Sequence, residues 1–197
     1  MKKIIFLCLI LFPNKGLIGR VNNNPFEYFS LSVELLKNVN NNDLHYFYQP
    51  KNGLATSITT PFYWGDIQAS VQILPFFGLK KDYVDFIGIH PNIKCGKSIH
   101  IFEKLRWYNA IGTGYYIIYF SKPLYTSHEI FHPGIAESEL SAGFLSELQY
   151  SFNNKINLNF GTNIDRIYTY KHIDMINMSM GISYLFKTPD WMILLLN

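Results

Sequence analysis

The chain has 197 residues and a formal net charge of +3 at pH 7. This length suits one domain, and the charge is too small to indicate a nucleic-acid partner. Charged residues make up only 16% of the sequence, against about 25% in an ordinary soluble protein, while aromatic residues reach 17%. This balance favours a β-barrel in a membrane, with a tyrosine-rich soluble periplasmic β-sandwich as the competing class.

The N-terminus has the form of a secretory signal peptide. Lys2 and Lys3 precede an apolar run over residues 4–12, too short to cross a bilayer as a helix, which needs about 20 apolar residues. We expect residues 1–20 to be removed during export from a bacterial cytoplasm. Cleavage would leave Cys95 as the only cysteine, so an intramolecular disulfide and a cysteine-rich metal site are excluded.

Strict alternation of apolar and polar residues predicts β-strands through the rest of the chain. In a strand, successive side chains lie on opposite faces, whereas a helix would need apolar residues three and four positions apart. The polar face consists mainly of Asn, Gln, Ser and Gly, as expected for the interior of a small transmembrane barrel. The clearest alternation lies at residues 29–35, 66–73, 139–150, 155–165 and 176–186.

The pattern defines nine candidate strands, at residues 26–37, 54–63, 66–76, 83–93, 98–108, 111–121, 136–151, 155–167 and 174–186. A bacterial barrel closes with an even number of strands. Because the alternation is poorest over residues 83–108, we expect one false or split strand there. We therefore predict an all-β, antiparallel up-and-down transmembrane β-barrel over residues 21–186, with eight strands and ten as the alternative.

The connections differ in length as in outer-membrane barrels, which have short turns at one end and long loops at the other. Residues 151–154 predict a tight hairpin, and residues 38–53 and 121–133 predict long extracellular loops. Residues 187–197 form a C-terminal tail, in which Pro189 should prevent the last strand from continuing.

Residues 181–186 resemble the closing strand of bacterial outer-membrane barrels. In that family a final aromatic residue, here Phe186, belongs to the signal for the barrel-assembly machinery. The resemblance implies that this machinery and outer-membrane lipid, including lipopolysaccharide, are partners, and it leaves the oligomeric state open. This chain continues beyond Phe186, whereas members of the family usually end there.

Residues 108–186 also resemble the lipid A deacylase (acyloxyacyl hydrolase) barrels, through the segments 112–116 and 147–152. Those enzymes use a His-x-Ser pair on a late strand, with an acidic residue that orients the histidine. The corresponding residues 163–168 include neither His nor Ser, and His172 is not followed by a serine two places on. We therefore predict no catalytic residue, and keep the deacylase activity as the alternative function.

The sequence of a zinc-binding motif is present without the helix that this motif requires. His128, Glu129 and His132 spell His-Glu-x-x-His, but Pro123 and Pro133 leave little room for the helix that this motif needs. Gly112-x-Gly114 lacks the third glycine and the following helix of a nucleotide loop. We predict neither a metal site nor a cofactor.

Several charged residues fall on the predicted polar face: His100, Lys104, Arg106, Glu139, Glu147 and Asp165. Charges in a water-poor interior need partners, so we expect structural ion pairs among them. Glu103 falls on the opposite face, which indicates either an error in the predicted register or a position near the membrane interface. The pairs Tyr63-Trp64 and Trp107-Tyr108 lie near strand ends, where interface anchoring explains them. The sequence predicts an integral outer-membrane barrel with a structural or surface-interaction role.

Overall fold

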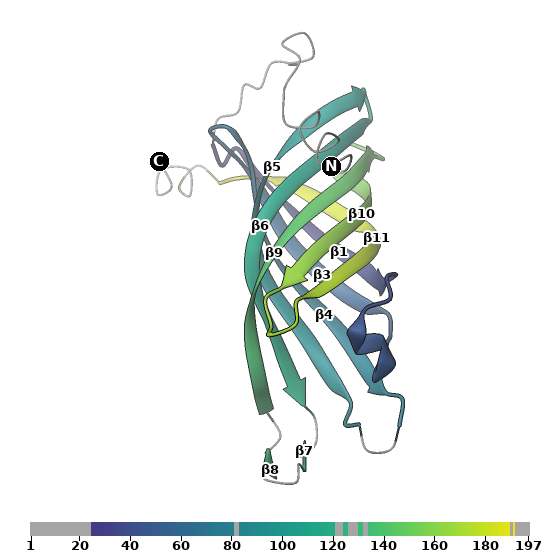
Figure 1. The fold of residues 1–197 in the computed structure, drawn as a ribbon. Coiled ribbons are helices and arrows are strands. Elements are labelled where there is room, and N and C mark those ends of the chain that lie inside the picture. The colour runs from purple at the N-terminus through teal and green to yellow at the C-terminus, as the bar shows by residue number, and fades with distance from the viewer. Residues whose placement is uncertain are drawn as a thin grey trace, which may run out of the picture.

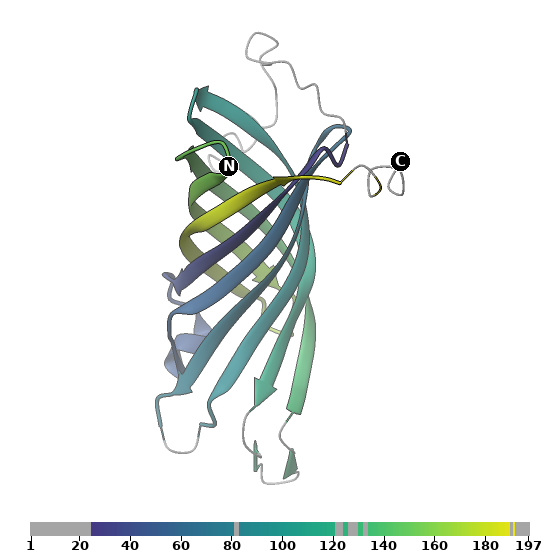
Figure 2. The same ribbon diagram turned by 180° about the vertical axis from the view of Figure 1, so that it is seen from behind.

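The chain folds into an antiparallel β-barrel, shown from two sides in Figures 1 and 2. The computed structural model describes residues 25–80, 83–120, 124–125, 130–131, 134–189 and 191. Its eight long strands are β1 (Tyr28–Asn38), β3 (Gly53–Phe62), β4 (Gly65–Gly78), β5 (Phe86–Phe102), β6 (Leu105–Phe120), β9 (Gly134–Ser151), β10 (Ile156–Ile167) and β11 (Ile173–Lys187).

The long strands follow one another around the ring. Their order is β4-β3-β1-β11-β10-β9-β6-β5, and pairing of β4 with β5 closes the barrel. All of these pairings are antiparallel. The predicted eight-stranded up-and-down barrel is therefore confirmed.

The predicted ambiguity over residues 83–108 has a simple cause. Three predicted strands, 83–93, 98–108 and 111–121, are two long strands, because β5 continues through Gly96 and the turn falls at residues 103–104. Pro91 lies within β5 opposite Val71 of β4. Glu103 is exposed in the turn, which agrees with a position near the interface.

The two ends of the barrel differ, as predicted. The short-turn end has turns at residues 63–64, 103–104 and 152–155, and the long-loop end has connections at 39–52, 79–85, 121–133 and 168–172. Both ends of the described chain lie at the short-turn end, where the backbone N–H of Thr188 donates to Glu27 O at 3.1 Å. β11 ends at Lys187, two residues before Pro189.

The predicted loop 38–53 is a compact cap at the long-loop end. It contains a 3-10 turn, η1 (Asp43–Tyr46), and a short strand, β2 (Tyr48–Pro50), which pairs with the end of β4; the turn is dark blue in Figure 1. In the loop 121–133, the described residues form the small hairpin of β7 (Leu124–Tyr125) and β8 (Ile130–Phe131). The signal-peptide prediction concerns residues outside the described part of the chain.

The two faces of the barrel wall have opposite chemistry. The inward face buries polar side chains such as Gln68, Gln72 and Asn159. The outward face is apolar on every long strand, where exposed side chains include Leu31, Val33, Leu35, Leu54, Ile58, Val71, Ile73, Ile93, Ile111, Leu140, Leu148, Phe160, Ile164, Met178, Met180 and Ile182. An apolar surface of this extent is unstable in water and suits a lipid environment.

The soluble β-sandwich alternative is wrong, since a sandwich would bury its apolar side chains between two sheets and expose the polar face. Among the described residues, no helix combines the length and the apolar character needed to cross a membrane.

Candidate functional site

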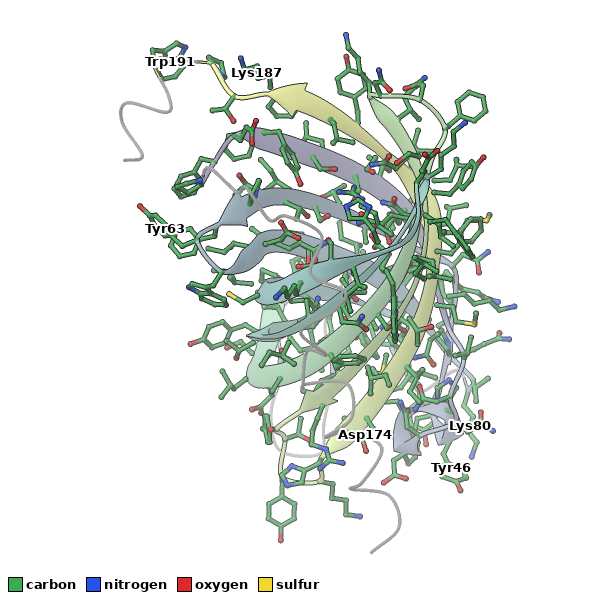
Figure 3. All side chains as sticks on the ribbon, turned by 90° about the horizontal axis from the view of Figure 1, so that it is seen from above. Tyr46, Tyr63, Lys80, Asp174, Lys187 and Trp191 are labelled. Carbon is green, nitrogen blue, oxygen red and sulfur yellow. The ribbon has the colours of Figure 1, made fainter. Side chains whose placement is uncertain are left out.

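Much of the barrel interior is lined by polar side chains; Figure 3 draws the side chains with the barrel seen from above. An eight-stranded barrel is narrow enough to be filled by its own side chains, and buried polar groups require hydrogen-bond partners. Examples are Ser32 Oγ with Ser57 Oγ (2.7 Å), Gln68 Nε2 to Ser57 Oγ (3.2 Å), Ser98 Oγ to Asp66 Oδ2 (3.0 Å) and Gln149 Nε2 to Glu147 Oε1 (2.6 Å).

A serine, a histidine and an aspartate meet in this interior. His90 comes from β5, Ser141 from β9 and Asp165 from β10, so the three side chains approach one another across the lumen. His90 Nε2 is 2.7 Å from Ser141 Oγ, and His90 Nδ1 is 3.6 Å from Asp165 Oδ2. Each of the three residues is at most 3% exposed. We call this group the Ser141 cluster.

Neighbouring residues fix the members of the Ser141 cluster. Asn163 donates its Nδ2–H to the carboxylate of Asp165. Thr113 Oγ1 donates to the backbone carbonyl of Ser141 at 2.7 Å and so ties β9 to β6 at this level. These two bonds hold the carboxylate of Asp165 and the backbone of Ser141 in place.

A buried lysine lies next along the lumen. Lys94 is 2% exposed, and its Nζ donates to Asn92 Oδ1 at 2.6 Å. The same amide oxygen accepts a hydrogen bond from Ser70 Oγ at 2.6 Å. Glu147, 2% exposed, faces the lumen from β9. The barrel therefore encloses both basic and acidic side chains, which a low-dielectric interior tolerates only in hydrogen-bonded networks.

An apolar plug closes the lumen at the long-loop end. Its buried members are Leu74, Phe76, Phe86, Tyr116, Ile167 and Met175, and Leu44, Tyr48, Ile118, Phe120 and Ile173 pack against them. The rings of Phe76 and Phe86 are stacked at 4.6 Å, and Tyr48 meets Phe86 edge-on at 4.8 Å. Leu44 and Tyr48 belong to the loop 39–52, so this loop forms the outer part of the plug.

Asparagines hold the loop 39–52 on the barrel. Asn40 Nδ2 donates to Asp174 O at 2.7 Å, and Asn40 Oδ1 accepts from the backbone N–H of Ile176 at 2.7 Å. Asn42 Nδ2 also donates to Asp174 O, at 2.9 Å, and the Asn42 side chain caps η1 by accepting from Leu44 N. The asparagine run that predicted a loop therefore anchors that loop to β11.

The replacement Asn40→Ala should loosen this loop, because it removes two hydrogen bonds to β11: the N–H of Ile176 loses its side-chain acceptor, and Asp174 O keeps only Asn42 of its two asparagine donors. We expect trypsin to cut after Lys51 several-fold faster in the folded protein, since cleavage of a native loop follows the free energy of its local opening. Asn41→Ala is the matched control, because Asn41 is exposed. Equal cleavage rates in the two variants would contradict an anchoring role for Asn40.

A small cavity separates the plug from the Ser141 cluster. Its volume is about 10 Å³, and its lining includes His90, Asp165 and Tyr116. A space of this size accommodates about one water molecule when polar groups surround it. Within the described part of the chain, the Tyr116 hydroxyl is buried and has no hydrogen-bond partner. The cavity is therefore polar on one side and apolar on the other.

The structure corrects part of the predicted charge network. Glu147 and Asp165 are buried in the lumen as expected, but His100 and Lys104 are exposed near the turn at 103–104. Between His100 and Phe102 the register of β5 shifts, which ends the regular alternation. Arg106 and Glu139 are half-buried.

Across the described residues, two acid–base contacts are present: His90 with Asp165, which is an ion pair only when the imidazole is protonated, and Arg166 with Asp174. The predicted ion pairs of Lys104 and Arg106 are therefore wrong. The second observed pair lies on the surface at the long-loop end, where Arg166 Nε donates to Asp174 Oδ1 at 2.7 Å.

The sequence prediction missed His90, Lys94 and Ser141. His90, Asn92 and Lys94 alternate with Ile89, Pro91 and Ile93, and this alternation would have placed all three on the polar face. Pro91 within the segment obscured the pattern. Their meeting with Ser141 depends on strand register.

The residues suggested by other motifs remain separate. His172 is exposed in the loop 168–172, whereas Ser179 belongs to the inward-facing set of β11. His128, Glu129 and His132 lie outside the described residues, so the prediction made for them stays a prediction. Among the residues that are described, no group of three or more His, Cys, Asp or Glu side chains could hold a metal ion.

No family model and no curated protein matches this sequence. Solved structures do match. Neisserial surface protein A has a TM-score of 0.54 and 11% identity, over 82% of this chain and 96% of that one. The outer membrane protein AlkL has a TM-score of 0.53 and 15% identity, over 89% and 98%. The attachment invasion locus protein Ail of Yersinia pestis has a TM-score of 0.52 and 14% identity, over 81% and 99%.

The chain has the fold of the small outer-membrane β-barrels. At these identities the likeness shows the fold, and it confirms the predicted architecture. The comparisons do not show the narrower resemblance to the lipid A deacylase barrels.

Proposed function

We propose that the protein is an integral protein of the bacterial outer membrane that presents its long-loop end to the exterior as an interaction surface. In this proposal the barrel is a closed anchor. The observation that carries it is the cap over the lumen, because the loop 39–52 is hydrogen-bonded to β11 and packed on the apolar plug. A loop held in this way offers a fixed surface above a barrel that is filled inside.

The cap exposes apolar and aromatic side chains. Tyr46 is 77% exposed, and Phe47 and Leu79 are also exposed. The backbone N–H of Leu79 donates to Phe47 O at 2.9 Å, and this bond connects the loop 79–85 to the loop 39–52. Exposed apolar residues on an ordered surface are a common feature of protein-binding sites. The names of two similar structures, a surface protein and an attachment protein, are consistent with such a role.

The outward face supports lipid as a partner. A hollow of about 910 Å³ crosses several strands of the wall, and outward side chains such as Val33, Ile58, Val71, Ile93 and Tyr115 line it. We propose that acyl chains of the outer membrane, including those of lipopolysaccharide, fill this hollow. The aromatic Phe186 stacks on Phe29 where β11 meets β1, at 5.7 Å, and we propose this closing segment as the contact for the barrel-assembly machinery.

Cysteine labelling on intact cells tests the location and the orientation. In a background with Cys8→Ser and Cys95→Ser, Tyr46→Cys and Tyr63→Cys place single thiols at opposite ends, and the replaced side chains are 77% and 65% exposed. We expect a large membrane-impermeant maleimide to label Tyr46→Cys in intact cells. Tyr63→Cys should react only after the outer membrane is permeabilised, because its turn faces the periplasm.

The reverse labelling pattern would contradict the orientation. Release of the protein from membranes without detergent would contradict its integral location. As a control for protein amount, both variants should react equally in detergent.

The lipid A deacylase activity remains the alternative function, and the geometry offers no specific support for it. His172 lies in an exposed loop and Ser179 on the inward face of β11. Mass spectrometry of lipid A with and without expression of the protein tests it. Loss of an acyl chain on expression would favour the deacylase activity over the closed anchor.

A further inference from the structure

We propose that Ser141 is a nucleophilic serine, activated by His90 and supported by Asp165, that reacts with small carboxylic esters reaching the lumen from the long-loop end. This inference goes beyond the anchoring function and does not depend on it. The distances that carry it are 2.7 Å from Ser141 Oγ to His90 Nε2 and 3.6 Å from His90 Nδ1 to Asp165 Oδ2.

The order of these atoms is the one that ester hydrolysis by a serine nucleophile requires. A neutral imidazole carries one proton, and a carboxylate near Nδ1 favours the tautomer with the proton on that nitrogen. Nε2 then presents its lone pair to the serine hydroxyl and can accept the hydroxyl proton. Such a triad is recognised by its geometry, independently of the fold and of the order of the residues in the chain.

The supporting contacts match the roles of the three residues. Asn163 donates to the carboxylate of Asp165. Thr113 Oγ1 donates to the backbone carbonyl oxygen of Ser141. The Asp165 carboxylate lies 3.6 Å from His90 Nδ1, beyond hydrogen-bond distance, so it acts on the imidazole through its charge.

An unpartnered hydroxyl points to a ligand. Tyr116 is 6% exposed and lines the cavity together with His90 and Asp165. Its hydroxyl has no partner in the described part of the chain, although a buried hydroxyl normally has one. A phenolic O–H that is free in a small cavity can donate to a water molecule or to a carbonyl oxygen.

The size of the cavity limits the substrate. At about 10 Å³ the cavity has room for a water molecule, so an ester needs local opening of the plug above it. Leu44 of the loop 39–52 packs on the outer side of that plug. The accessible substrates are therefore esters with a short acyl group, such as an acetyl ester.

The reaction has two balanced steps. First, His90 Nε2 takes the proton of Ser141 Oγ while Oγ attacks the carbonyl carbon; the bond to the alcohol oxygen breaks, and the departing alcohol takes that proton. Second, water adds to the acyl-serine, giving up one proton through His90 and releasing the carboxylic acid. Ser141 then regains its hydroxyl proton.

A fluorophosphonate probe tests the nucleophile directly. Attack by Ser141 Oγ on phosphorus forms the O–P bond and expels fluoride, which leaves a stable mass increase on one peptide. With the purified full-length protein folded in detergent, we expect the label at Ser141 and its loss in Ser141→Ala. The same preparations should differ in hydrolysis of p-nitrophenyl acetate.

Two variants separate catalysis from structure. His90→Gln keeps a hydrogen-bonding side chain but removes the base, so labelling should slow by about 100-fold or more. Leu44→Ala thins the plug, so labelling of Ser141 should become faster. Each variant is first shown to be folded by its electrophoretic mobility before and after heating.

Two outcomes would overturn the proposal. One is an unlabelled Ser141 in both the wild-type and the Leu44→Ala proteins. The other is a labelling rate that His90→Gln leaves unchanged. Because these measurements use purified protein, they are independent of the cell-surface experiment.

Discussion

Gly143→Leu is expected to prevent stable closure of the barrel. A Cβ atom at residue 143 would collide with Asp165 Oδ1 and would lie 3.0 Å from the backbone oxygen of Ile164. The larger leucine side chain would have to displace Asp165, which lies beside His90 in the lumen. Overpacking a core costs about 1–3 kcal/mol, and leaving a buried polar group without its partner costs about 1–3 kcal/mol more. The expected loss is therefore a large part of the stability of an ordinary domain.

Ala142→Leu is the matched control, because residue 142 is the next position on β9 and faces outward. The added apolar atoms lie against lipid, so we expect its unfolding free energy to change by less than about 0.5 kcal/mol. Electrophoretic mobility with and without heating reports closure of the barrel, and urea unfolding in lipid vesicles reports its stability. Equal behaviour of the two variants would show that Gly143 does not face the lumen.

The alternation of residue types predicted which face of each strand lies inside. Leu158, Phe160 and Ile164 of β10 face outward and Asn159 and Asp165 inward, as period 2 requires. This prediction succeeds because successive residues of a strand face the lipid and the lumen in turn, and lipid favours apolar side chains whereas the lumen favours polar ones. The same pattern failed between Lys94 and Arg106, where polar residues near the short-turn end occupy both faces.

The Ser141 cluster could not be predicted from any local pattern. His90 and Ser141 are 51 residues apart in the chain, and they meet because β6 lies between their strands in the ring. Their level in the lumen depends on two strand registers, and a change of one residue would turn either side chain to the outer face. Composition and periodicity determine the faces of the strands, whereas register determines which inward residues meet.

The loop 39–52 also depends on contacts between residues far apart in the sequence, which local sequence does not predict. Asparagines predicted an irregular segment, and the segment does connect two strands. Its ordered state depends on contacts between Asn40 and residues 174–176, more than 130 positions away in the sequence. Local composition predicts a loop, but it contains no information on such distant partners.

Phe76→Ala should remove the centre of the apolar plug. Phe76 is 0% exposed and stacks on Phe86. Truncation of a buried phenylalanine costs about 3–5 kcal/mol, because packing is lost and a cavity remains. We expect a decrease of this size in the free energy of unfolding by urea in lipid vesicles. In a planar bilayer, we expect ion-conducting events that are absent for the wild-type protein, because the plug separates the polar lumen from the long-loop end.

Phe77→Ala distinguishes the plug from the outer surface. Phe77 follows Phe76 on β4, is 45% exposed and lies under Lys51 Nζ, 5.7 Å from the ring centroid. Its truncation removes a side chain of the same size from the outer face, so the expected loss is below about 1 kcal/mol, without conducting events. If Phe76→Ala and Phe77→Ala lost equal stability and neither conducted ions in the bilayer, the plug would not close the lumen. The difference between two adjacent phenylalanines therefore tests the closed anchor on which the proposed function depends.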